Sequence, residues 1–168
     1  MVSKSRNRWI FWGFVALFAI DQISKLLTHR FIPLMTESSS LYPYGGIGVF
    51  KNFLGIEFSI SHATNKGAAW GFFANAHHYL LAFRILFIVG LIAYCIFGGK
   101  NRAVQMPLLL VMTGAIGNVV DFFVYGHVVD MLHFVFWGYD YPVFNVADTA
   151  IFAGVFWLIS LSLVTGRP

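Results

Sequence analysis

The sequence predicts an all-α membrane fold of four transmembrane helices with a small extracytoplasmic β region. Of its 168 residues, 58% are hydrophobic and 11% are charged, whereas a soluble domain carries about 25% charged residues. Four apolar segments reach the length of about 20 residues that a helix needs to cross a bilayer. Between the first two, residues 56–61 alternate apolar and polar side chains, which is the period of a half-buried strand.

The expected spans cover residues 9–27, 79–97, 104–125 and 146–164. The first follows a basic stretch and is therefore similar to a signal peptide. No small-residue cleavage pattern follows it before Asp21, so we expect it to stay in the chain. We expect one membrane domain over residues 1–168, whose outer loop, about residues 30–78, contains the strands.

The basic residues beside the spans predict the orientation of the chain. They lie before the first span, between the second and third, and after the fourth: Lys4, Arg6, Arg8, Lys100, Arg102 and Arg167. These three regions fall on one side of a four-span protein, so both termini should be cytoplasmic. The net charge of +4 comes without a run of Lys and Arg, and binding to nucleic acid is not indicated.

Acidic side chains are rare, with 7 Asp and Glu in the chain, and four aspartates map to the outer half: Asp21, Asp121, Asp130 and Asp148. A carboxyl group near lipid is costly and usually marks a proton path, an ion site or a catalytic centre. Asp130 and Asp148 flank a short polar loop, so their carboxyls can face each other near the outer interface. Two such carboxyls can share one proton and activate water, which is a peptidase chemistry.

Amides and glycines surround these acids in the sequence. Asn65, Asn118 and Asn145 each offer a donor and an acceptor that can hold a peptide backbone. Asn118 can instead join two helices, and Asn145 can instead cap the fourth. Gly114 begins a Gly-x-x-Gly pattern that permits close helix packing.

Five motifs occur in order: residues 21–25 (Asp-Gln-Ile-Ser-Lys), 65–70 (Asn-Lys-Gly-Ala-Ala-Trp), 114–121 (Gly-Ala-Ile-Gly-Asn-Val-Val-Asp), 126–130 (Gly-His-Val-Val-Asp) and 144–148 (Phe-Asn-Val-Ala-Asp). Together they resemble the lipoprotein signal peptidases, also called signal peptidase II. The resemblance implies an intramembrane aspartyl endopeptidase that removes signal peptides from prolipoproteins, cutting before the diacylglyceryl-modified cysteine. It implies neither a metal nor an organic cofactor.

The resemblance also implies roles for single residues. Asp130 and Asp148 match the catalytic dyad. Five further residues are expected to contact substrate in the site: Asn65, Asn118, Asn145, Asp121 and Gly114. Asp21 and Lys25 match a supporting pair, and their i, i+4 spacing also permits a plain structural ion pair.

One position departs from the family, because Phe122 follows Asp121 where an Arg is usual. Either Lys25, Lys66 or Arg84 replaces that charge, or Asp121 is left partly neutral.

The expected partners are lipid-modified prolipoproteins and membrane lipids. We expect a monomer in a bacterial cytoplasmic membrane with its active site near the outer face.

Two alternatives remain open. A small proton-coupled transporter would use the four aspartates as relay groups, although the sequence lacks the related halves typical of transporters. His127, Asp130 and His133 are three positions apart, and on a helix they would share a face that could bind a metal.

Overall fold

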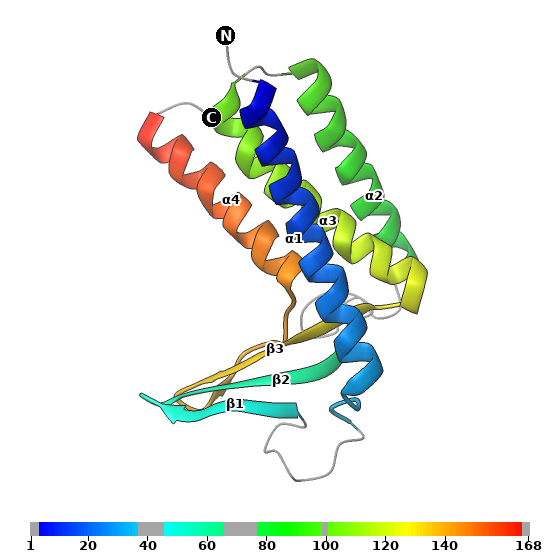
Figure 1. Ribbon diagram of the computed structural model, residues 1–168, viewed down its shortest axis with the longest axis vertical. Coiled ribbons are helices and arrows are strands. Elements are labelled where there is room, and N and C mark those ends of the chain that lie inside the picture. Colours follow the sequence, from blue (N-terminus) through cyan, green and yellow to red (C-terminus); the bar gives the residue numbers. More distant parts are fainter. Residues whose placement is uncertain (1–3, 37–45, 66–76, 99–100, 166–168) are drawn as a thin grey trace. The chain divides into compact units, whose positions relative to one another are not determined.

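The computed structural model describes residues 4–36, 46–65, 77–98 and 101–165 (Figure 1). Its helices are α1 (Lys4–Phe31), α2 (His77–Ala93), a π-helical turn η3 (Tyr94–Gly98), α3 (Arg102–Tyr125) and α4 (Val146–Thr165). Its strands are β1 (Gly46–Phe53), β2 (Ile56–Asn65), β3 (Val128–Phe136) and β4 (Tyr139–Asp140). Lys66, Lys100 and Arg167 lie outside the described residues.

The chain divides into two compact units, which we describe separately. The helical unit comprises residues 1–22, 82–119 and 146–168, and the sheet unit comprises residues 23–81 and 120–145. Helices α1, α2 and α3 contribute residues to both units.

The prediction of four membrane spans is confirmed. Helices long and apolar enough to cross a bilayer cover Arg8–Phe31, His78–Gly98, Ala103–Tyr125 and Val146–Thr165. The first extends beyond the expected end at Leu27, because residues 28–31 continue the helix without a proline or glycine.

Close packing of α3 against α4 organises the helical unit (Figure 1). A Cβ atom at Gly154 would lie 2.6 Å from the carbonyl oxygen of Pro107, and one at Gly114 would collide with the carbonyl oxygen of Ala147. Glycine at these two positions therefore lets the helix backbones approach, as is common where lipid supplies no hydrophobic driving force between helices. The opposite surface of α4 exposes large apolar side chains such as Phe152 and Leu163, as a lipid-facing surface requires.

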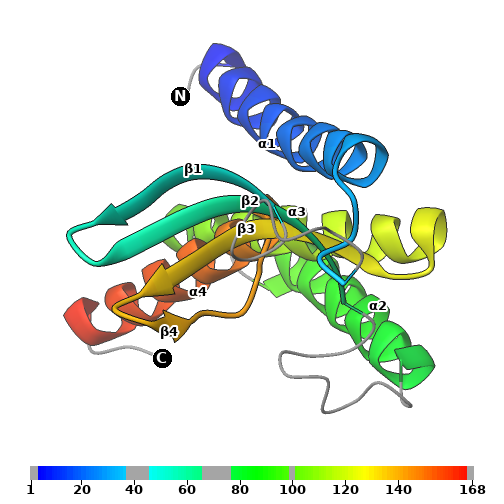
Figure 2. The ribbon, with the colours of Figure 1, turned by 90° about the horizontal axis from the view of Figure 1, so that it is seen from below.

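The sheet unit contains an antiparallel sheet with the strand order β1-β2-β3-β4 (Figure 2). Strands β1 and β2 confirm the prediction made from the alternation at residues 56–61. They are joined by a tight turn at Leu54 and Gly55, both of which have positive φ (54° and 82°). The pairing of β2 with β3 is irregular between Ile60 and Ala63.

Strand β3 was not predicted, since residues 126–145 were expected to form only a loop. Its sequence, Val-Val-Asp-Met-Leu-His-Phe-Val-Phe, is apolar at neighbouring positions rather than at alternate ones. Residues 128–131 are all buried, so this part of the strand is covered on both faces and has no alternation to detect.

Candidate active site

Asp130 lies on β3 in the sheet unit, and two amide groups hold its carboxylate. The Nδ2 of Asn145 donates to Asp130 Oδ1 at 2.6 Å, and the Nδ2 of Asn65 donates to Asp130 Oδ2 at 3.2 Å. Only 2% of Asp130 is exposed. Buried charged groups need such partners, and donors to a carboxylate favour its ionised form.

The register of the sheet explains why Asn65 reaches this carboxylate. Ala63 on β2 is paired with Asp130 on β3, and Asn65 is paired with Val128. Asn65 is therefore a diagonal neighbour of Asp130 on the same face, at a distance that a side chain can bridge.

Asn145 is placed by a backbone pairing just before α4. Phe144 forms a bridge with Leu132, in which the Leu132 N–H donates to the Phe144 oxygen at 2.7 Å and the Phe144 N–H donates back at 3.1 Å. This pairing fixes the backbone beside Asn145, which is fully buried. The Nδ2 of Asn145 also lies 3.4 Å from the carbonyl oxygen of Val129. The position is therefore more than a helix cap, because its amide contacts the aspartate directly.

Asp148 lies in the helical unit, in the first turn of α4. The Nδ2 of Asn118, on α3, donates to Asp148 Oδ1 at 2.8 Å. The start of a helix also favours a negative charge, because unpaired backbone N–H groups point towards it. The close approach of α3 and α4 at Gly114 sets the spacing that this hydrogen bond needs.

Asp21 joins the same part of the helical unit. Its Oδ1 accepts a hydrogen bond from the Ala147 N–H at 2.7 Å, and its Oδ2 lies 2.6 Å from where a Cβ of Gly117 would be. Gln22 donates to Asp21 Oδ2 at 3.1 Å and to the Gly117 oxygen at 3.3 Å. Asp21 therefore ties α1 to α3 and to the start of α4. We had assigned no role to Gln22, although it lies inside the first motif.

Lys25 and Asp121 form a buried ion pair in the sheet unit. Lys25 Nζ lies 2.8 Å from Asp121 Oδ2, and both side chains are fully buried. Asp121 Oδ2 also accepts a hydrogen bond from the Val129 N–H at 3.2 Å. Lys25, one of the groups considered as replacements for the missing Arg at Phe122, thus contacts Asp121 in the structure.

The residues expected to form one site lie in both units. Asp130, Asn65, Asn145, Asp121 and Lys25 belong to the sheet unit. Asp148, Asn118, Asp21 and Gly114 belong to the helical unit. The contacts within each unit are those described above, and the pairing of Asp130 with Asp148 stays a prediction.

The alternative of a metal site formed by His127, Asp130 and His133 on one helix face is wrong. It required a helix, but Asp130 and His133 lie on β3, where residues three apart point to opposite faces. His133 is instead bound by the exposed carboxylate of Asp140, with 2.6 Å between Nε2 and Oδ1.

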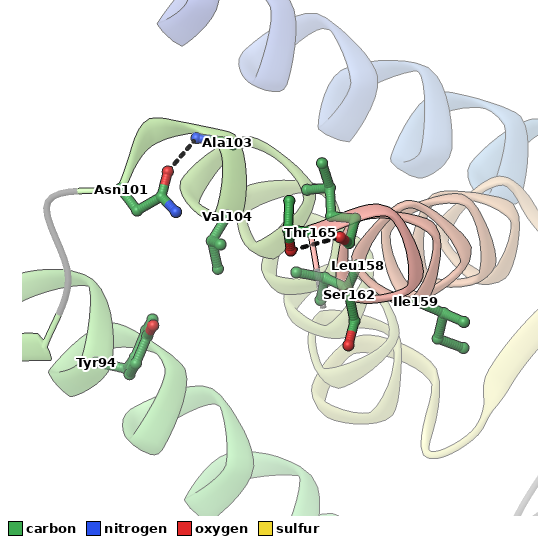
Figure 3. A pocket seen from close by; sticks show the side chains of 9 residues that line it. Tyr94, Asn101, Ala103, Val104, Leu158, Ile159, Ser162 and Thr165 are labelled. Atoms are coloured by element: carbon green, nitrogen blue, oxygen red, sulfur yellow. Dashed lines mark hydrogen bonds between the residues drawn. The ribbon is translucent and has the colours of Figure 1, made fainter. Parts of the chain in front are cut away.

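The helical unit also contains a hollow of about 710 Å³ between the start of η3, the start of α3 and the last turns of α4 (Figure 3). It lies at the end of α4 away from Asp148. Among the described residues that line it, none is an Asp, Glu or His.

The family model described as "Signal peptidase (SPase) II" matches residues 13–164. A lipoprotein signal peptidase of Chlamydia pneumoniae is 36% identical over 148 residues, which cover 87% of this chain and 83% of that protein. One from Psychromonas ingrahamii is 31% identical over 159 residues, covering 92% and 83% of the two chains.

Two solved structures, both described as bacterial membrane enzymes studied by the in meso method, are similar in fold. The first has a TM-score of 0.76 and 25% identity, covering 93% of this chain and 88% of the other. The second has a TM-score of 0.71 and 25% identity, covering 92% of each chain.

Proposed function

Because the chain belongs to the signal peptidase II family, we propose that Asp130 and Asp148 are the catalytic dyad of this aspartic endopeptidase. Members of this family remove signal peptides from prolipoproteins, and so does this protein. The comparisons give no support to the transporter alternative. Cleavage before the diacylglyceryl-modified cysteine follows as the expected position of the cut.

The observation that carries the proposal is that each aspartate has amide donors of its own. Asn65 and Asn145 hold Asp130, and Asn118 holds Asp148. Side-chain amides orient a carboxylate without changing its charge, so each acid can take up and release a proton in a fixed direction.

The reaction needs one shared proton between the two carboxyls. The ionised carboxylate takes a proton from water while the water oxygen attacks the scissile carbonyl carbon. The protonated carboxyl donates its proton to the carbonyl oxygen, which gives a neutral tetrahedral intermediate. When that intermediate collapses, the carboxyl that took the water proton gives it to the leaving nitrogen and the C–N bond breaks. The other carboxylate takes a proton from a hydroxyl of the intermediate, so the dyad again holds one proton.

The other expected site residues divide into two groups. Asn65, Asn118 and Asn145 position the acids, and their amide oxygens remain suited to accepting N–H groups of the substrate backbone. Asp121 and Gly114 fit supporting roles better than substrate contact, because Asp121 is paired with Lys25 and Gly114 is covered by α4.

The setting follows from the same proposal. This is a membrane protein with bacterial relatives. The distribution of basic residues supports cytoplasmic termini and an active site near the outer face. Substrate would enter sideways from the lipid, and a monomer with lipid contacts is sufficient for the chemistry.

The test uses purified full-length protein in detergent with a diacylglyceryl-modified prolipoprotein. We expect Asp130→Asn and Asp148→Asn each to lower the cleavage rate by at least about 10²–10⁴-fold, the usual contribution of a positioned acid or base. Asp140→Asn is the matched control, because Asp140 is 65% exposed at its side chain and binds His133. Thermal unfolding checks that each variant is folded. Full turnover by a folded Asp130→Asn or Asp148→Asn variant would remove that residue from the dyad.

A further inference from the structure

Three histidines converge in the sheet unit from segments that are distant in sequence. His29 lies at the end of α1, His62 lies on β2, and His127 lies between α3 and β3. One ring nitrogen of each could serve as a ligand atom, and these three atoms all lie within 4.8 Å of one another. The ring centroids of His29 and His62 are 5.4 Å apart, and those of His29 and His127 are 6.2 Å apart. The proposed dyad uses none of these side chains.

His62 gives an independent indication of a ligand. It is only 4% exposed, and its Nδ1 lies 2.8 Å from the carbonyl oxygen of Ile32. A carbonyl oxygen can only accept, so Nδ1 carries the proton and Nε2 carries the lone pair. That Nε2 is buried and has no hydrogen-bond partner among the described residues. A buried acceptor left unsatisfied is unfavourable and asks for an explanation.

We propose that His29, His62 and His127 bind a Zn²⁺ ion through their imidazole nitrogens. Imidazole is a preferred ligand of zinc, and metal-binding histidines usually donate their second ring N–H to a backbone carbonyl or carboxylate. The bond from His62 to Ile32 is of that kind. Three histidines leave the fourth position of a tetrahedral zinc open to water. Hard cations such as Ca²⁺ and Mg²⁺ do not fit, because they take oxygen ligands.

The distances require only a local adjustment. Zinc–nitrogen bonds of about 2.0–2.1 Å in a tetrahedron put ligand nitrogens about 3.3 Å from each other. His29 is exposed at the end of a helix, so its rotamer can change to close the remaining gap. His62 supplies a fixed point, because its own backbone oxygen also accepts a hydrogen bond from the Met35 N–H at 2.9 Å.

The ion would brace the fold rather than take part in peptide cleavage. It would join the end of α1, the irregular stretch of β2 and the connection that leads into β3. His62 precedes Asn65 by three residues, and His127 precedes Asp130 by three. A metal cross-link at this place therefore holds together the two strands that carry an aspartate and its amide donor.

The experiment measures zinc binding by the full-length protein in detergent, after removal of any affinity tag and of bound metal. Isothermal titration with Zn²⁺ should give one ion per chain, Zn²⁺ should raise Tm, and Co²⁺ should give the absorption bands of a tetrahedral nitrogen site. His29→Gln removes an exposed ligand, so we expect it to fold. Loss of a residue that merely orients a ligand weakens metal binding about 10–100-fold, so His29→Gln should weaken it by more than about 100-fold.

His78→Gln is the matched control, because His78 belongs to the same unit but lies outside the cluster. It should bind Zn²⁺ like the wild type. The proposal is overturned if the wild type binds no zinc, or if His29→Gln binds it as tightly as the wild type. Because metal binding and Tm are the readouts, neither result depends on the identity of the catalytic residues.

Discussion

Removing the ammonium group of the buried Lys25–Asp121 pair should destabilise the protein strongly. Lys25→Met keeps the length of the side chain but leaves the Asp121 carboxylate buried without its cation. Breaking one partner of a fully buried ion pair costs about 3–5 kcal/mol. At about 2–4 °C per kcal/mol for a chain of this size, Tm should fall by about 6–20 °C.

A second variant distinguishes two effects on stability. One is the loss of attraction between the two charges, and the other is the cost of leaving one charge buried without its partner. Asp121→Asn removes the negative charge but keeps an oxygen that can accept the Val129 N–H. The double variant Lys25→Met/Asp121→Asn should therefore lose less stability than the sum of the two single variants, by about 0.5–3 kcal/mol.

The assay is thermal unfolding of each purified variant in the same detergent, with Lys51→Met as control. Lys51 is exposed on β1, and its replacement should change stability by no more than about 0.5 kcal/mol. If Lys25→Met and Lys51→Met unfold at the same temperature, the Lys25–Asp121 contact does not hold the sheet unit together. If the stability losses of the two single variants add up to the loss of the double variant, direct coupling between the two side chains is likewise refuted.

Three further predictions concern the amides, the helix contact and the departure from the family. Asn145→Ala should slow cleavage by about 10–100-fold, since a hydrogen bond to a charged group contributes about 1.5–3 kcal/mol, whereas Asn101→Ala should leave the cleavage rate unchanged. Gly114→Ala should lower Tm by more than Gly90→Ala, because a Cβ at Gly114 meets the backbone of α4 and one at Gly90 meets nothing within 4 Å. Phe122→Arg should not raise the cleavage rate, because a buried lysine already neutralises the preceding aspartate; a marked rise would contradict this.

The parts of the fold that depend on local pattern could be predicted from the sequence. The four spans follow from uninterrupted apolar length, and β2 follows from alternation. Strand β3 could not be predicted in this way, because residues 128–131 are buried on both faces. The spacing of His127, Asp130 and His133 left open a helix-based metal site, but Asp130 and His133 lie on this strand.

Partners distant in sequence were also beyond local pattern. The motifs identified Asp130 and Asn145 as site residues, but not the bond between them. Lys25 was one of several candidates to neutralise Asp121, and the packing of α1 in the sheet unit places it against that carboxylate. Nothing in the spacing of His29, His62 and His127 indicates that they meet, since each comes from a different segment.

The contact between Asn65 and Asp130 depends on the antiparallel register of β2 and β3, and so on the number of residues in each strand. Side chains alternate between the two faces of a strand, so a slip of one residue would present Val129 or Met131 to Asn65 in place of Asp130. The irregularity between Ile60 and Ala63 divides the pairing of β2 with β3 into two stretches whose registers are set separately. A residue inserted in β2 between the β1–β2 turn and this irregularity can be absorbed at the irregularity. A residue inserted between Ala63 and Asn65 would instead turn the Asn65 amide away from Asp130. The length of the β1–β2 hairpin can thus change without moving Asn65, whereas the short stretch from Ala63 to Asn65 must keep its register with β3.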